Sequence, residues 1–450
     1  MYGSHSGSIP FRLRQSIFPI LNKERIAAPV PFAAIRFPPE SNPVRADRDV
    51  SNPWFRARLP SRPRPPTGFR ALFCLGLILG LRAVSGATPE AWAADLSQVF
   101  DRLVRDRRIL GAQVVVGRND EVRFDHFWGR RFPGRPEAVN GDTQFCIGSD
   151  SKPMTTALVF TLVADGTLGP DDPVAKWLPE FSSLQTVSGA PAERSPTLRE
   201  LMSHRGGIYG QNLKPTPEQL ALIRNYSRTL EESVSGIARQ PLLTQPGQAF
   251  AYSGAGYCVL GRVAEVAGHQ SIEALLQARL CGPLALRRTT YFPGDEPNVA
   301  VGSRLAGGRL VPITQAPHLA KPRQRFALVG GGIYSTARDQ ARFARMVLAQ
   351  GRGNGSQVLP PSVWSEWIGR QERDSDYGLG WKQTFGRSPN RPTRLEHQGS
   401  LAGYRASLAV NLESGFFCAA NWTLVVSANS GGSKGTIRDA LHRAEKALAR

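Results

Sequence analysis

The stretch Phe145-Cys-Ile-Gly-Ser-Asp-Ser-Lys-Pro153 sets the expectations for the rest of the chain. Ser149 and Lys152 are three positions apart, so their side chains lie side by side only if this stretch forms the first turn of a helix. An apolar run follows over residues 154–164 and ends near Gly166, a residue typical of a helix C-terminus. The sequence therefore predicts a buried helix with Ser149 at its N-terminus and Lys152 beside it.

A serine and a lysine in this arrangement supply a nucleophile and its base. Backbone amides at a helix N-terminus also favour negative charge on an attacking oxygen or a developing oxyanion. The chain has eight lysines, and only Lys152 has a serine three positions before it. The alternative is that Ser149 caps the helix while Lys152 is solvated on the first turn.

The composition sets limits on fold and partners. A chain of 450 residues, 41% of them hydrophobic, is long enough for a substantial core, in one large domain or several. The net charge is +20, but no nucleic-acid-binding motif accompanies it, so we expect no nucleic acid partner. The five cysteines form no CxxC pair and no cluster with metal-ligand spacing. Nothing in the sequence calls for a metal or an organic cofactor.

The N-terminal region is expected to lie outside the folded domain. Residues 1–68 are rich in proline and arginine, which is typical of a disordered basic tail. Residues 69–88 resemble a signal peptide, because the apolar run Ala71–Leu81 is too short to span a bilayer and small residues follow it. We therefore expect an exported protein, periplasmic or associated with the cell envelope, that meets a membrane only through this segment if it is uncleaved. The alternative is a buried helix of the first domain.

Hydrophobic periodicity over residues 89–450 predicts an α+β fold. Strands come early and late in this region, and a mostly helical insert occupies about residues 156–320. We therefore expect one β-sheet with an inserted α domain. The expected elements are helices at 90–107, 174–178 and 435–450, and strands at 111–117, 121–129, 394–398, 403–412 and 415–424.

Two further clusters are candidates for a functional site. Tyr252-Ser-Gly254 lies on a turn just before an apolar helical run, from which a tyrosine can reach into a cleft. His397-Gln-Gly-Ser400 ends a short strand, where a glycine lets the backbone of a ligand approach closely. The alternatives are a tyrosine packed at a domain edge and a strand-terminating turn with a solvated histidine.

The order Ser-x-x-Lys, Tyr-x-x, His-x-Gly resembles that of the penicillin-recognising serine hydrolases. Within them the chain looks like the class C β-lactamase group, with its DD-peptidase, D-aminopeptidase and esterase relatives. The resemblance covers about residues 89–445 and implies a β-lactamase/transpeptidase-like α+β fold. In this fold an antiparallel β-sheet is flanked by helices, an all-α domain is inserted, and the site lies between the two. Three accessory stretches share it: Leu201-Met-Ser-His-Arg-Gly-Gly207, Gly330-Gly-Gly-Ile-Tyr-Ser-Thr-Ala-Arg-Asp339 and Tyr377-Gly-Leu-Gly-Trp381.

The resemblance also implies roles for individual residues. Ser149 would be the nucleophile, Lys152 its partner and Tyr252 the second-motif residue. The third motif would be His397-Gln398-Gly399, and the backbone amides of Ser149 and Ser400 would form the oxyanion hole. The implied reaction is acyl transfer through an acyl-enzyme on a small-molecule or peptidoglycan-derived substrate: an ester, a D-amino-acid peptide or amide, or a β-lactam.

Two positions depart from the family pattern. Gly254 stands where many relatives have an asparagine, and losing such a side-chain amide costs about 0.5–1.5 kcal/mol. This loss disfavours amide and β-lactam hydrolysis more than ester hydrolysis. His397 stands where a lysine is common, and because histidine titrates near neutrality, we expect any carboxylate contact there to depend on pH.

The sequence leaves two questions open. The general base is either a neutral Lys152 or a Tyr252 phenolate stabilised by a cationic Lys152. The competing class of protein is a non-catalytic envelope protein that keeps the fold for binding or scaffolding.

Overall fold

The computed structural model describes residues 91–294, 298–320, 323–426 and 433–449. The chain divides into two units, Met1–Leu81 and Arg82–Arg450, and every described residue belongs to the second. The tail and the signal-like segment expected at residues 1–68 and 69–88 lie outside the described residues. No helix in the described part of the chain is long and apolar enough to cross a membrane.

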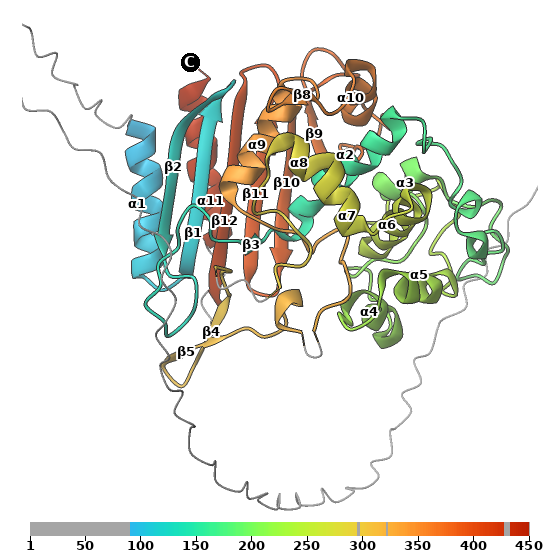
Figure 1. The fold of residues 1–450 in the computed structure, drawn as a ribbon, viewed down its shortest axis with the longest axis horizontal. Coiled ribbons are helices and arrows are strands. Elements are labelled where there is room, and N and C mark those ends of the chain that lie inside the picture. Colours follow the sequence, from blue (N-terminus) through green and yellow to red (C-terminus); the bar gives the residue numbers. More distant parts are fainter. Residues whose placement is uncertain (1–90, 295–297, 321–322, 427–432, 450) are drawn as a thin grey trace, which may run out of the picture. The chain divides into compact units, whose positions relative to one another are not determined.

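One antiparallel sheet brings the two ends of the folded unit together (Figure 1). Its main path runs β2-β1-β12-β11-β10-β9, so an early strand, β1, pairs with a late one, β12, with Val114 opposite Ala420. This arrangement is why strands from both ends of the sequence enclose the helical segment. The strands are β1 (Ile109–Arg118), β2 (Glu121–Gly129), β9 (Lys382–Phe385), β10 (Pro392–Leu401), β11 (Tyr404–Asn411) and β12 (Phe416–Val426).

Helices cover both faces of the sheet. On one face, α1 (Ala91–Arg105) and α11 (Ser433–Leu448) share a hydrophobic core with Val114 and Val116 of β1, while the intervening Val115 belongs to the core on the other face. On that other face α9 (Ala337–Leu348) packs against β1, β11 and β12, as Figure 1 shows. Successive residues of a strand point to opposite faces, which explains why β1 is buried along almost its whole length.

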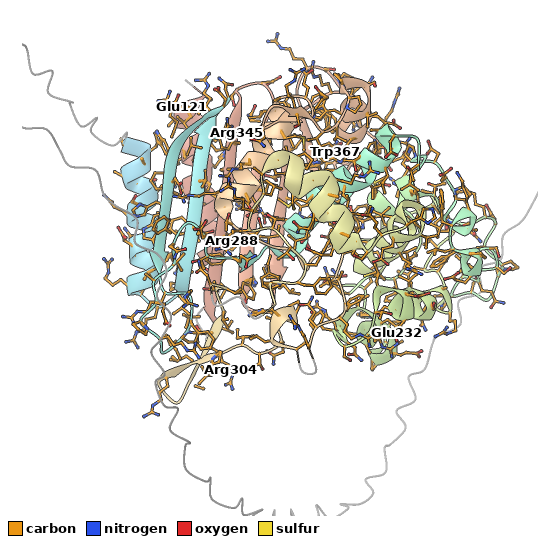
Figure 2. All side chains as sticks on the ribbon, in the orientation of Figure 1. Glu121, Glu232, Arg288, Arg304, Arg345 and Trp367 are labelled. Atoms are coloured by element: carbon orange, nitrogen blue, oxygen red, sulfur yellow. The ribbon has the colours of Figure 1, made fainter. Side chains whose placement is uncertain are left out.

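The remaining helices form a second part beside the sheet, joined to it by α2 (Ser151–Ala164). Three of these helices begin with capping boxes, in which a threonine and an acid or amide three residues later satisfy the first amides. Glu232, labelled in Figure 2, closes the box of α5. Trp367 of α10 (Pro361–Ile368), also labelled there, ties α10 to α2 by donating from Nε1 to Thr156 Oγ1 (2.9 Å). The others are α3 (Leu198–Met202), α4 (Pro217–Arg224), α5 (Leu230–Ala238), α6 (Gly254–Gly268), α7 (Ile272–Leu276) and α8 (Gly282–Leu284).

The structure confirms the α+β class and the first hairpin, the last three expected strands and the terminal helix. The insert differs in one respect: β4 (Ser303–Ala306) and β5 (Arg309–Pro312) lie inside the range expected to be helical, and β4 pairs with β12. The short helix expected at 174–178 is a 3-10 turn, Val174–Lys176.

Candidate active site

Ser149 lies in a 3-10 turn, η1 (Gly148–Asp150), that runs directly into α2. Ser151 fixes this turn, because its Oγ donates to Gly148 O (2.7 Å) and accepts from Ile333 N (3.1 Å). Ser149 itself is half-buried, whereas the first three turns of α2 are fully buried. The expected serine at the head of a buried helix is therefore confirmed.

Lys152 is almost completely enclosed, with 1% of its surface exposed. Its Nζ donates to Gly330 O (2.6 Å) and to Ser149 Oγ (3.4 Å). Nζ also lies over the rings of Tyr252 and Tyr257, 4.6 and 4.9 Å from their centroids, and aromatic faces attract a cation. The alternative of a solvated lysine is therefore wrong.

Two glycines let the turn that carries Ser149 lie directly against β10. Gly148 has a φ of +54°, and a Cβ there would lie 2.5 Å from Ser400 N. A Cβ on Gly399 would overlap Ile147 O. The backbone that approaches Gly399 is thus the chain's own, not that of a ligand as the sequence suggested. The approach brings the backbones of Ser149 and Ser400 together.

The turn of the second cluster is held by Ser253. Its Oγ donates to Tyr209 O (2.6 Å) and caps α6, and its backbone N donates to His204 Nδ1 (3.1 Å). These bonds place the Tyr252 ring 4.2 Å from the His204 ring and against Lys152 Nζ.

His204 is the centre of an aromatic cluster next to Lys152. Its ring centroid lies 4.9 Å from that of Tyr377, 5.1 Å from that of Tyr257 and 5.8 Å from that of Phe250. Burial, followed by the nearby charge of Lys152, holds the pKa of His204 well below its usual range. Burial also raises the pKa values of Tyr257 and Tyr377 well above theirs. These three groups therefore stay uncharged.

Both ring nitrogens of His397 are used within the protein. Nδ1 accepts from Gln398 N (2.9 Å), and Nε2 pairs with Tyr377 OH (2.9 Å). Burial and the Lys152 charge lower the pKa of His397 to about 3, although Asp150 Oδ1 lies 3.7 Å from Nδ1. Asp150 does not raise the pKa of His397 back, because Asp150 is fully buried and burial raises its own pKa well above the usual range. A protonated Asp150 carries no negative charge that would stabilise a cationic imidazole. The expectation that His397 titrates near neutrality is therefore wrong, and its imidazole is a neutral support for Tyr377.

Gln211 occupies the space left by the missing side chain at Gly254. Gly254 N donates to Gln211 Oε1 (3.1 Å), and a Cβ on Gly254 would lie 2.8 Å from the same oxygen. No described residue accepts a hydrogen bond from Gln211 Nε2, and the Gln211 side chain lines the pocket described next. An amide donor is thus present beside the second motif, but it comes from a different segment.

A narrow pocket of about 40 Å³ opens beside Ser149. Ser149 and Lys152 line it together with Gly254 of α6 and Ser400 of β10, whereas Tyr252 and His397 do not reach its wall. The rest of the lining includes Gln211, Ile223, Arg224, Leu328, Gly330 and Leu401. Polar groups able to react therefore converge at one end of a cavity that is otherwise partly apolar, which is typical of a ligand site.

Comparison with known proteins shows the family to which the chain belongs. The Beta-lactamase family model matches residues 96–448, well over half of the chain. The chain belongs to the Beta-lactamase family. Esterase EstB of Burkholderia gladioli is 28% identical to it over 337 residues, which cover 69% of this chain and 84% of EstB. A putative D-alanyl-D-alanine carboxypeptidase of Escherichia coli K12 is 24% identical, covering 63% of this chain and 72% of that protein.

Solved structures support the same fold. EstCE1, described as a hydrolase with promiscuous acyltransferase activity, superposes with a TM-score of 0.66 at 22% sequence identity. The superposition covers 78% of this chain and 98% of EstCE1. This Beta-lactamase family member therefore has the β-lactamase/transpeptidase-like fold that its motifs implied.

The structure brings the three motifs of this family member to one place and adds residues that sequence reasoning missed. Tyr377 lay in a stretch already noted, but nothing in the sequence indicated its bond to His397. Gln211 and Arg224 lie in loop and helix segments without any motif, so no sequence signal pointed to them. Among the described residues, no group of three or more His, Cys, Asp and Glu side chains is arranged to hold a metal ion.

Proposed function

We propose that this chain is a serine hydrolase that cleaves esters through an acyl-enzyme on Ser149. The observation that carries the proposal is the 3.4 Å distance between Lys152 Nζ and Ser149 Oγ at the edge of the pocket. A serine hydroxyl becomes an effective nucleophile when a neighbouring base takes its proton, and Lys152 is the side chain that bonds to it. The backbones of Ser149 and Ser400 lie near each other because Gly148 and Gly399 allow a close approach, and they would supply two amides for the oxyanion.

The reaction would run in two steps, acylation of Ser149 and hydrolysis of the acyl-enzyme. Ser149 Oγ attacks the ester carbonyl while its proton passes to the Lys152–Tyr252 pair, and the tetrahedral oxyanion is stabilised by the amides of Ser149 and Ser400. The carbon–oxygen bond to the leaving group then breaks, and the proton from the pair neutralises the departing alkoxide. Water attacks the acyl-enzyme with the same pair as its base, and the acid and free Ser149 are released.

Several observations favour an ester over an amide or a β-lactam. The neutral His397 offers no permanent charge to a substrate carboxylate, and esters have better leaving groups, so less protonation is needed in the transition state. EstB is an esterase by its name and spans most of the folded region. D-amino-acid peptides and amides remain the runner-up substrates, because a putative carboxypeptidase is also similar. The enclosed Lys152 argues against a scaffold that merely keeps the fold, because a buried amine beside a serine serves no evident structural purpose.

The test is labelling of the full chain with a fluorophosphonate, followed by peptide mass spectrometry. We expect one adduct, on Ser149. Hydrolysis of 4-nitrophenyl butyrate should be lost in Ser149→Ala and kept in the control Ser183→Ala, which changes an exposed serine elsewhere in the chain. An adduct elsewhere, or turnover that survives Ser149→Ala, would refute the assignment. The same panel with nitrocefin and D-alanine 4-nitroanilide separates esterase from β-lactamase and peptidase activity.

A further inference from the structure

The pocket beside Ser149 carries positive charge without a compensating acid. Two basic side chains, Lys152 and Arg224, line it, and none of its described lining residues is acidic. The Lys152 amine is already engaged by Gly330 O, Ser149 Oγ and two tyrosine rings. The Arg224 guanidinium is therefore a positive charge that no acidic residue of the described lining balances.

Arg224 is the last residue of α4, and its side chain is exposed. Within the described residues no carboxylate forms a salt bridge with it, although many other arginines in this chain are paired in this way, such as Arg199 with Asp171 and Arg394 with Glu445. A guanidinium presents a planar fork of donors that matches a carboxylate in two parallel hydrogen bonds. The phenol of Tyr226 interacts with this guanidinium but does not neutralise it. A guanidinium without a carboxylate partner at the wall of a reactive pocket is therefore suited to an anionic group on a substrate.

Part of the pocket lining is apolar. Ile223, Leu328 and Leu401 line the pocket together with Ser149 and Arg224, which suits a short methylene chain better than a second charged group. A substrate that fits has a reactive carbonyl at one end, a few methylenes along this wall, and a negative charge at the other end.

We propose that Arg224 makes this hydrolase selective for acyl groups that end in a carboxylate, as in half-esters of dicarboxylic acids. The inference rests on the proposed function and names its substrate class. The negative charge belongs to the acyl part of the substrate rather than to the leaving group. Tyr252 is one of the two residues that return the proton to the leaving group, and it does not line this pocket. The leaving group therefore departs on the side of the aromatic cluster, and the acyl chain lies along α4.

The experiment compares substrates that differ by one charge. 4-Nitrophenyl hydrogen adipate and 4-nitrophenyl methyl adipate share the acyl chain and the leaving group, and only the first is anionic. We expect the full chain to have the higher kcat/KM on the anionic ester, and Arg224→Gln to lower that value about tenfold, the order of one hydrogen bond to a charged group. The loss should fall mainly on KM, because the contact is made equally in the ground and transition states. Activity on the methyl ester should fall less than activity on the anionic ester, so that the ratio of the two kcat/KM values falls in Arg224→Gln.

Arg239→Gln is the matched control. Arg239 is an exposed arginine at the end of α5 and does not line the pocket, so its replacement removes the same charge from a different place. We expect this variant to keep the preference for the anionic ester, Arg224→Glu to reverse it, and added salt to weaken it in the native chain because exposed charges are screened.

Each failure has a distinct meaning. Equal kcat/KM for the two adipates, with Ser149 still labelled by fluorophosphonate, overturns this inference and leaves the proposed function standing. A preference that survives Arg224→Gln overturns the role of Arg224. A preference for 3-carboxy-4-nitrophenyl butyrate over 4-nitrophenyl butyrate that is lost in Arg224→Gln overturns the acyl-side placement. Absence of both ester turnover and the Ser149 label overturns the proposed function itself.

Discussion

Replacing Gly148 by alanine should disable the site while leaving most of the fold in place. The added Cβ would lie 2.5 Å from Ser400 N and 3.0 Å from the carbonyl carbon of Gly399. Because non-bonded heavy atoms settle near 3.5 Å, β10 and the turn would have to separate by about 1 Å. A misplacement of about 1 Å among catalytic groups costs about 100-fold in rate. The φ of +54° adds strain of about 1–2 kcal/mol for a residue with a Cβ.

The control for this prediction is Gly166→Ala at the opposite end of α2. Gly166 has a φ of +77°, but a Cβ there would meet nothing within 4 Å, so this variant carries the backbone strain without the steric conflict. We expect Gly166→Ala to lose about 1–2 kcal/mol of unfolding free energy in urea from backbone strain alone, and Gly148→Ala to lose more because of the added steric conflict. Only Gly148→Ala should lose about 100-fold in kcat/KM on 4-nitrophenyl butyrate. Near-normal kcat/KM in a folded Gly148→Ala protein would show that the close approach of Ser400 is not needed for catalysis.

Three further predictions concern the turn and its neighbours. Ser149→Ala should abolish ester turnover without shifting the melting temperature by more than about 2 °C, since the hydroxyl is half-buried and its structural role is small; a large loss of stability would assign Ser149 a structural role instead. Burial lowers the pKa of His397 to about 3, while the unfolded chain titrates near about 6.5, so the unfolded state binds the extra proton between these values. The free energy of unfolding should therefore fall as pH drops from about 6.5 to about 3, and urea titrations of His397→Asn across that range should show a shallower fall. Burial raises the pKa of Asp150, so the stability it contributes is present below its unfolded value of about 3.9 and is lost as pH rises. Asp150→Asn should consequently raise the melting temperature at pH 8 more than at pH 4, and an equal shift at both values would contradict a protonated Asp150.

The parts of the fold that could be predicted are those in which one local pattern decides the structure. The hairpin at 109–129 turns at Asn119, which has a φ of +58°, and the last three strands are bounded by short turns. The helix after Ser149 is mainly apolar and is buried on nearly every side, because it passes between two packed parts. Burial on all faces distinguishes such a helix even without an amphipathic stripe.

The parts that could not be predicted depend on tertiary contacts. β4 and β5 are four-residue strands, and β4 becomes a strand by pairing with β12, more than 100 positions away. His397 appeared in the sequence to be a titrating group near a substrate. Its neutrality comes from complete burial and from Lys152, which no spacing within the third motif reveals.

The two departures from the family pattern have a common structural answer. Gly254 removes an amide from the second motif, and Gln211 places another amide against the same backbone. His397 puts no permanent charge in the third motif, and Arg224 places a positive charge in the pocket beside Ser149, which His397 does not line. Gln211 and Arg224 both come from the segment that leads into and through α4, whereas Ser149 and Lys152 belong to η1 and α2. The two proposals together therefore assign catalysis and substrate choice to different parts of the chain, and they predict that changes within residues 211–224 alter which ester is cleaved more than how it is cleaved.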